Sequence, residues 1–118
     1  MLAHGSILAD RFYDRATVRR LAVDGRTPAL DEIDLAVVEL AERVIDDATA
    51  VSRDDLDRLR RLGLDDAEAV DVVVAAAARC FFSKTLDALE VEADAAYAEL
   101  EPELREALTV GRPIGAVA

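Results

Sequence analysis

Two side chains of this sequence are the only ones of their kind and could do chemistry near neutral pH, the imidazole of His4 and the thiol of Cys80. His4 is the only imidazole, and an imidazole can act near neutral pH as the base that activates a thiol. Cys80 is the only thiol, and the cations Arg79 and Lys84 lie close enough in sequence to favour its reactive thiolate. Each residue also has a structural interpretation, His4 as a partly exposed residue of a first helix and Cys80 as a small buried hydrophobic residue. For Cys80 we expect the structural role.

Two clusters of carboxylates are the other groups that could bind a ligand, in this case a cation. They are Asp54, Asp55 and Asp57, and Asp65, Asp66 and Glu68. Neither cluster has the alternating spacing and the glycine of a calcium-binding loop. We therefore interpret these carboxylates as helix caps and solvated surface, paired in part with the neighbouring cations Arg58, Arg60 and Arg61. We expect no metal site and no cofactor.

The composition predicts one soluble domain over residues 1–118. Apolar residues make up 53% of the chain, enough to build a core. The formal net charge of −11 argues against binding to nucleic acid or to an anionic membrane surface, because the long-range field repels both. A single cysteine excludes an internal disulfide framework. With no signal peptide and no apolar run of about 18 residues, we expect a cytoplasmic protein.

The segment that should organise the fold runs from Asp65 to Val91 and reads as one long helix. Asp65 is a good N-cap, and Glu68 completes a capping box with it. No glycine or proline interrupts the segment, and most of its positions are apolar. A helix that is apolar around most of its circumference is normally surrounded by other helices. We therefore expect a central helix, with Phe81 and Phe82 filling space inside the bundle.

The rest of the chain is also predicted to be helical. Asp31 and Ser52 are N-cap residues, Gly63 and Leu64 fit a Schellman stop, and Pro102 suits a first helical position. Gly5 is a weak point within the first helix, costing about 1 kcal/mol relative to alanine. The shorter helices are expected over 2–14, 16–23, 31–47, 53–62 and 102–110, followed by a frayed or docked tail. The fold class is therefore all-α, a helical bundle around one long central helix.

The order and spacing of several segments resemble one known family. These segments are ELAERV, the Ser52-capped helix, LGLDDAE, FFSK and YAELEPELREALTVGRP. Together they look like the C-terminal portion of the alkylhydroperoxidase-like (AhpD-like), carboxymuconolactone decarboxylase superfamily, in its peroxidase-related branch. The resemblance extends from about Leu2 to Pro113. It implies hydroperoxide reduction with a thiol reductant, and a homo-oligomer.

The catalytic motif of that family is only partly matched. Its peroxidase members carry a Cys-Xaa-Xaa-Cys pair, followed four residues after the second cysteine by a histidine. MLAHG resembles the residues after that second cysteine, which makes His4 the match to the motif histidine. Both cysteines would then precede Met1, together with the N-terminal part of the fold. Either Met1 is an internal methionine of a longer protein, or the chain is a degenerate copy with another role.

Two functions follow from these observations. The resemblance implies an alkylhydroperoxidase-like protein, but we expect this chain to be inactive, since a sulfenic acid formed on one thiol must be closed by a second. The alternative is a non-catalytic helical self-association or interaction module. Without the family's N-terminal elements, apolar surface of the long helix should stay uncovered and be buried against a second copy. Decarboxylase or lactone chemistry lacks an identifiable set of acid and base groups.

Overall fold

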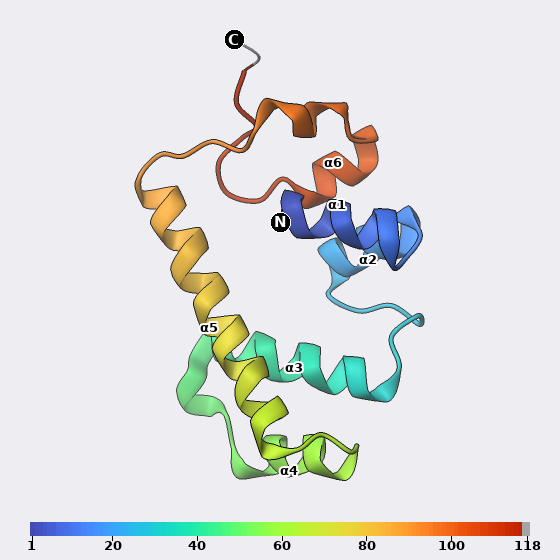
Figure 1. Ribbon diagram of the computed structural model, residues 1–118, viewed down its shortest axis with the longest axis vertical. Coiled ribbons are helices and arrows are strands. Elements are labelled where there is room, and N and C mark those ends of the chain that lie inside the picture. The colour runs from blue at the N-terminus through green and yellow to red at the C-terminus, as the bar shows by residue number, and fades with distance from the viewer. Residues whose placement is uncertain (117–118) are drawn as a thin grey trace. The chain divides into compact units, whose positions relative to one another are not determined.

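The computed structural model describes residues 1–116, and their fold is all-α, as predicted (Figure 1). The long helix is α5, and none of residues 1–116 belongs to a β-strand longer than an isolated bridge. The elements in chain order are α1 (Leu2–Arg11), α2 (Arg15–Asp24), α3 (Glu32–Asp47), η1 (Ala48–Ala50), α4 (Arg53–Arg61), α5 (Asp66–Ala88), η2 (Ala95–Glu99) and α6 (Pro102–Leu108).

The chain divides into two compact units. The middle unit is Leu30–Lys84, and the terminal unit combines Met1–Ala29 with Thr85–Ala118. The boundary falls within α5, so most of that helix belongs to the middle unit. The prediction of a single domain over residues 1–118 stays a prediction.

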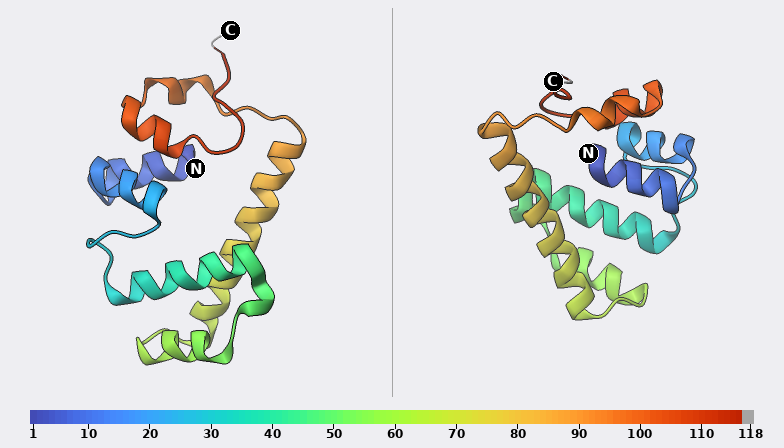
Figure 2. Two further views of the ribbon diagram at one scale, coloured as in Figure 1. Left: turned by 180° about the vertical axis from the view of Figure 1, so that it is seen from behind. Right: turned by 45° about the horizontal axis from the view of Figure 1, so that its top comes forward.

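The core of the terminal unit brings both ends of the described chain together. Its buried residues are Leu2 of α1, Val18 of α2, and Leu104 and Leu108 of α6. Both views of Figure 2 show α1 and α2 beside α6. The segment after α6 is docked rather than frayed, because the Gly115 amide donates to the Ala93 carbonyl over 2.9 Å. Residues 117 and 118 of the predicted tail lie outside the described part.

The core of the middle unit is formed by α3, α4 and the first half of α5. Its buried residues are Ala36 and Leu40 of α3, Leu59 of α4 and Ala69 of α5. Leu59 is completely buried. Partly buried residues pack around them: Val37, Val44, Val51, Leu56, Leu62, Leu64, Val72 and Val73.

The predicted helix ends in the middle unit are confirmed by their hydrogen bonds. The Asp65 carboxylate accepts from the Glu68 amide, and the Glu68 carboxylate accepts from the Asp65 amide, both over 2.8 Å. After α4, Gly63 has a φ of 104°, and the Leu64 amide donates to the Leu59 carbonyl. These bonds are the capping box and the Schellman stop that the sequence indicates.

Three helix boundaries and the burial of the long helix differ from the prediction. The first helix ends at Arg11 rather than near residue 14, the long helix at Ala88 rather than Val91, and the last at Leu108 rather than near residue 110. More importantly, α5 is not surrounded by helices: its only buried residues are Ala69 and Ala76. Phe81 and Phe82 do not fill interior space, since they are 74% and 56% exposed. The apolar pattern predicted the helix correctly but did not show which of its faces is covered.

Candidate functional site

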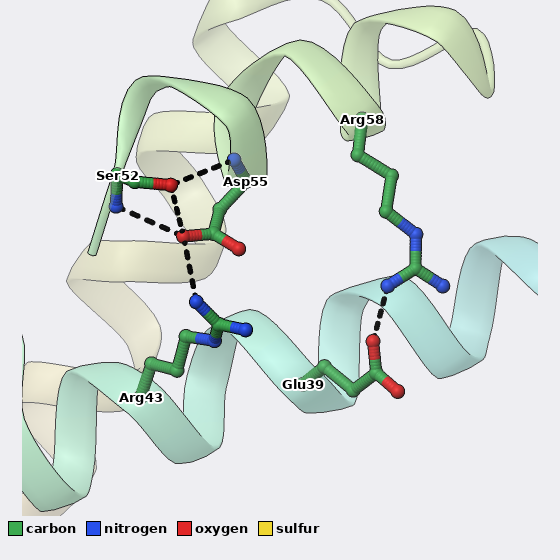
Figure 3. Close-up of polar contacts among 5 residues, drawn as sticks. All are labelled: Glu39, Arg43, Ser52, Asp55 and Arg58. Carbon is green, nitrogen blue, oxygen red and sulfur yellow. Dashed lines mark hydrogen bonds and ion pairs between the residues drawn. The ribbon is translucent and has the colours of Figure 1, made fainter. Parts of the chain in front are cut away.

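Polar contacts hold α3 and α4 together, and these two helices form the surface against which α5 packs (Figure 3). The Asp55 carboxylate accepts from the Ser52 amide over 2.9 Å and from the Ser52 hydroxyl over 2.8 Å. The Arg43 guanidinium of α3 donates to the same Asp55 oxygen over 3.1 Å. One turn away, Arg58 of α4 forms an ion pair with Glu39 of α3. Two ion pairs therefore fix α4 against α3.

One face of α5, which we name the inner face, packs against α3 and α4. Ala69 is buried in the middle-unit core, and Val72 and Val73 pack at its margin. Ala76, one turn further on, is also buried. These residues are three and four positions apart, the spacing of one helix face. The inner face is therefore one apolar face of α5, and its residues are covered by the middle-unit core.

The opposite face of α5 carries a second apolar row with the same kind of spacing, which we name the outer seam. Its members alternate steps of three and four residues, and every one of them is exposed. Steps of this kind are typical of a helix that packs against another helix along a coiled-coil seam. The outer seam consists of Ala67, Val70, Val74, Ala77 and Phe81.

The outer seam leaves apolar side chains in contact with solvent. Val70 is 58% exposed and Val74 is 59% exposed. Phe81 and the flanking Phe82 together leave on the order of 250 Å² of aromatic surface in solvent, taking roughly 200 Å² for each side chain. With the two valines, the apolar patch reaches a few hundred Å². A patch of a few hundred Å² is the size of the largest apolar patch on a typical monomer, and such a patch is often functional.

The charged residues of α5 are unevenly distributed. Its first part carries Asp66, Glu68 and Asp71, and its second part carries Arg79, Lys84 and Asp87. The Arg79 guanidinium carbon lies 6.0 Å from the centre of the Phe82 ring. Asp66 is paired with Arg60 over 2.6 Å, yet its side chain remains 76% exposed. The outer seam therefore has Asp66 beside its first end and Lys84 beside its second end.

His4 and Cys80, the residues singled out by sequence, belong to different units. His4 is exposed on α1 in the terminal unit, and the only cysteine of the chain belongs to the middle unit. Cys80 is a free thiol on α5 and is half-buried rather than fully buried as expected. Its backbone carbonyl accepts a hydrogen bond from the Ser83 hydroxyl over 3.3 Å. Neither residue gains a catalytic partner within its own unit.

The acidic clusters serve as caps and ion-pair partners, as interpreted from the sequence. Asp57 and Asp66 both bind Arg60, over 2.5 and 2.6 Å. Arg58 was expected to pair with the same clusters but binds Glu39 instead. Within residues 1–116, no group of three histidine, cysteine or carboxylate side chains is arranged to hold a metal ion.

A second surface feature is an open groove of about 670 Å³ in the terminal unit, along α2 and α6. Two cations and three carboxylates line it, and Arg19 already pairs with Glu103 over 2.5 Å. Neither His4 nor Cys80 lines it, so it matches no chemistry indicated by the sequence. Its lining residues are Arg19, Arg20, Val23, Asp24, Glu103, Glu106, Ala107, Thr109 and Val110.

None of the helices within residues 1–116 is both long enough and apolar enough to span a membrane. Comparisons of the chain with family models, with curated proteins and with solved structures find no match.

Proposed function

We propose that this chain is a non-catalytic helical self-association module, in which a second copy covers the outer seam of α5. The observation that carries the proposal is the exposure of Val70, Val74 and Phe81 along one face of a helix whose other face is packed. Burying such a row against a like row removes apolar surface from both copies at once, at about 25 cal/mol per Å².

A second copy fits this surface better than a polyanion does. The net charge of −11 repels nucleic acid and anionic lipid. Asp66 lies beside one end of the outer seam and Lys84 beside the other, so the seam is complementary to a copy of itself that runs in the opposite direction. A twofold interface uses the same patch on both subunits, which is the commonest arrangement in homo-oligomers.

Two phenylalanine variants test the proposal. Phe81→Ser removes the largest side chain of the outer seam, and Phe12→Ser removes a phenylalanine that is 70% exposed at the end of α1. Light scattering after size-exclusion chromatography should give a dimer for the wild type and for Phe12→Ser. Phe81→Ser should associate at least tenfold more weakly, with an unchanged far-ultraviolet circular dichroism spectrum. Equal effects of the two substitutions would overturn the proposal.

We further propose that the chain uses an alkylhydroperoxidase-like helical scaffold without turning over hydroperoxides. The support is chemical: a peroxidatic thiolate takes one oxygen from the hydroperoxide and releases an alcohol, and a second thiol must then expel water to form a disulfide. Cys80 has no second cysteine in the chain. A single cysteine is also compatible with a cytoplasmic setting.

The test of this second statement is an alkyl hydroperoxide assay with a dithiol reductant. The wild type, Cys80→Ser and His4→Ala should all consume tert-butyl hydroperoxide no faster than the reductant alone. Turnover by the wild type that disappears in Cys80→Ser would contradict the non-catalytic assignment.

A further inference from the structure

We infer that the two copies of α5 pair antiparallel across the outer seam, with Phe81 facing the partner's Val70. This inference rests on the proposed self-association and adds its orientation and register. It follows from the order of large and small residues along α5 and from the position of its charges.

The order of side chains favours a reversed register. Along the outer seam, Val70 and Phe81 lie toward the ends and Val74 and Ala77 toward the middle. When a second helix runs in the opposite direction, Phe81 faces the partner's Val70 and Val74 faces the partner's Ala77. Each layer then combines a larger side chain with a smaller one, which is how facing positions interdigitate at native packing density. A parallel pair would place Phe81 against the partner's Phe81 and Ala77 against the partner's Ala77.

The charges favour the same orientation. Asp66 and Lys84 are 84 − 66 = 18 residues apart, about five helical turns, so they lie on the same side of α5. In the antiparallel register, Lys84 lies level with the partner's Ala67, next to the partner's Asp66. The same contact occurs twice because of the twofold axis. In a parallel pair, Asp66 would lie level with the partner's Asp66 and Lys84 level with the partner's Lys84, which is repulsive.

All of these residues belong to the middle unit, on a single uninterrupted helix. The side chain of Asp66 is 76% exposed although Arg60 binds one of its oxygens, so a second cation can reach it. Lys84 is exposed as well. The groups required for the ionic contact are therefore already accessible in one copy.

The orientation can be measured with two single spin labels in a full-length Cys80→Ser background. Ala67→Cys puts the label at the acidic end of the outer seam, and Ala75→Cys puts it near the twofold axis. In the antiparallel register, labels at position 67 are separated along the helix by 17 residues, roughly 25 Å at 1.5 Å per residue. Labels at position 75 are almost level, at an interaxial distance of about 10 Å.

We expect dipolar electron paramagnetic resonance to give a distance above roughly 25 Å for position 67 and a shorter one for position 75. Short distances at both positions would mean parallel pairing and would overturn the inference while keeping the self-association. No short distance at position 75, together with a monomeric mass, would instead reject the self-association itself. A dimer without a short distance at position 75 would place the interface elsewhere and would overturn the inference.

Discussion

The side chain of Leu108 fills the space beside Gly5: a Cβ atom built on Gly5 would lie 2.4 Å from Leu108 Cδ2 and 2.6 Å from Leu108 Cδ1. Both residues are buried in the core of the terminal unit or next to it. The glycine that appears as a weak point of the first helix is therefore what allows α6 to pack closely on α1.

Gly5→Ala should destabilise the chain, although alanine is the better helix former by about 1 kcal/mol. Leu108 is 2% exposed and has little room to move, so overpacking should cost about 1 to 3 kcal/mol. Urea unfolding of Gly5→Ala measures the net effect. In a Leu108→Ala background the same substitution should be neutral or stabilising, and a stabilising Gly5→Ala in the wild type would contradict the close contact.

The Asp55 carboxylate should make the stability of the chain depend on pH in the acid range. Hydrogen bonds from the Ser52 amide and hydroxyl, with the Arg43 cation, lower the pKa of Asp55 from its ordinary value of 3.8. The unfolded chain therefore binds a proton at Asp55 more readily than the folded chain does. The stabilising contribution of the ionised Asp55 is complete above about pH 4 and is lost as the pH falls through the lowered pKa. Denaturant unfolding between pH 2 and 6 should show less pH dependence for Asp55→Asn than for the wild type.

The matched control is Asp54→Asn, which removes an exposed carboxylate from the same turn of α4 and should leave the pH dependence nearly unchanged. Ser52→Ala, which removes the other half of the capping box, should cost about 1 kcal/mol at neutral pH. Equal pH dependence in Asp55→Asn and Asp54→Asn would contradict the role of the capping box.

Glu90 ends α5 in a left-handed conformation, with φ of 60°, that glycine adopts at lower cost. The Val91 amide donates to the Leu86 carbonyl over 3.0 Å, as in a Schellman motif whose C′ residue is Glu90. Glu90→Gly should raise the free energy of unfolding by up to about 1 kcal/mol. Glu90→Ala loses the same 3.5 Å contact with Arg112 but keeps the Cβ atom, so it should not raise the free energy of unfolding. A gain in both variants would show that φ is not the cause.

Local features of the sequence predicted local structure well. The caps at Asp31, Ser52 and Asp65 and the stop at Gly63 are formed by residues within a few positions of one another, so their patterns contain all the information needed. The all-α class follows from the same periodicities. The role of Gly5 was not predictable in this way, because it depends on Leu108 from the other end of the chain.

Uncovered apolar surface on the long helix is expected from the sequence, but the residues that form the outer seam could not be named, for a related reason. An apolar row shows that a helix face avoids water in its final state, but not which element covers it. Two separate rows can be read from the sequence of α5: Ala69, Val72, Val73 and Ala76 face the middle-unit core, and the row containing Val70, Val74 and Phe81 faces solvent. Both rows have helical spacing, and only the packing of α3 and α4 distinguishes them. The ion pair of Arg58 with Glu39 likewise required the position of α3.

The most direct test of the self-association is sedimentation equilibrium of the wild-type chain over a concentration series from about 1 to 100 µM. If a second copy covers the outer seam, the measured mass should rise with concentration toward twice 12.8 kDa. The mass of the Phe81→Ser chain should stay near 12.8 kDa over the same range. A wild-type chain that remains a compact 12.8 kDa monomer at every concentration would contradict it.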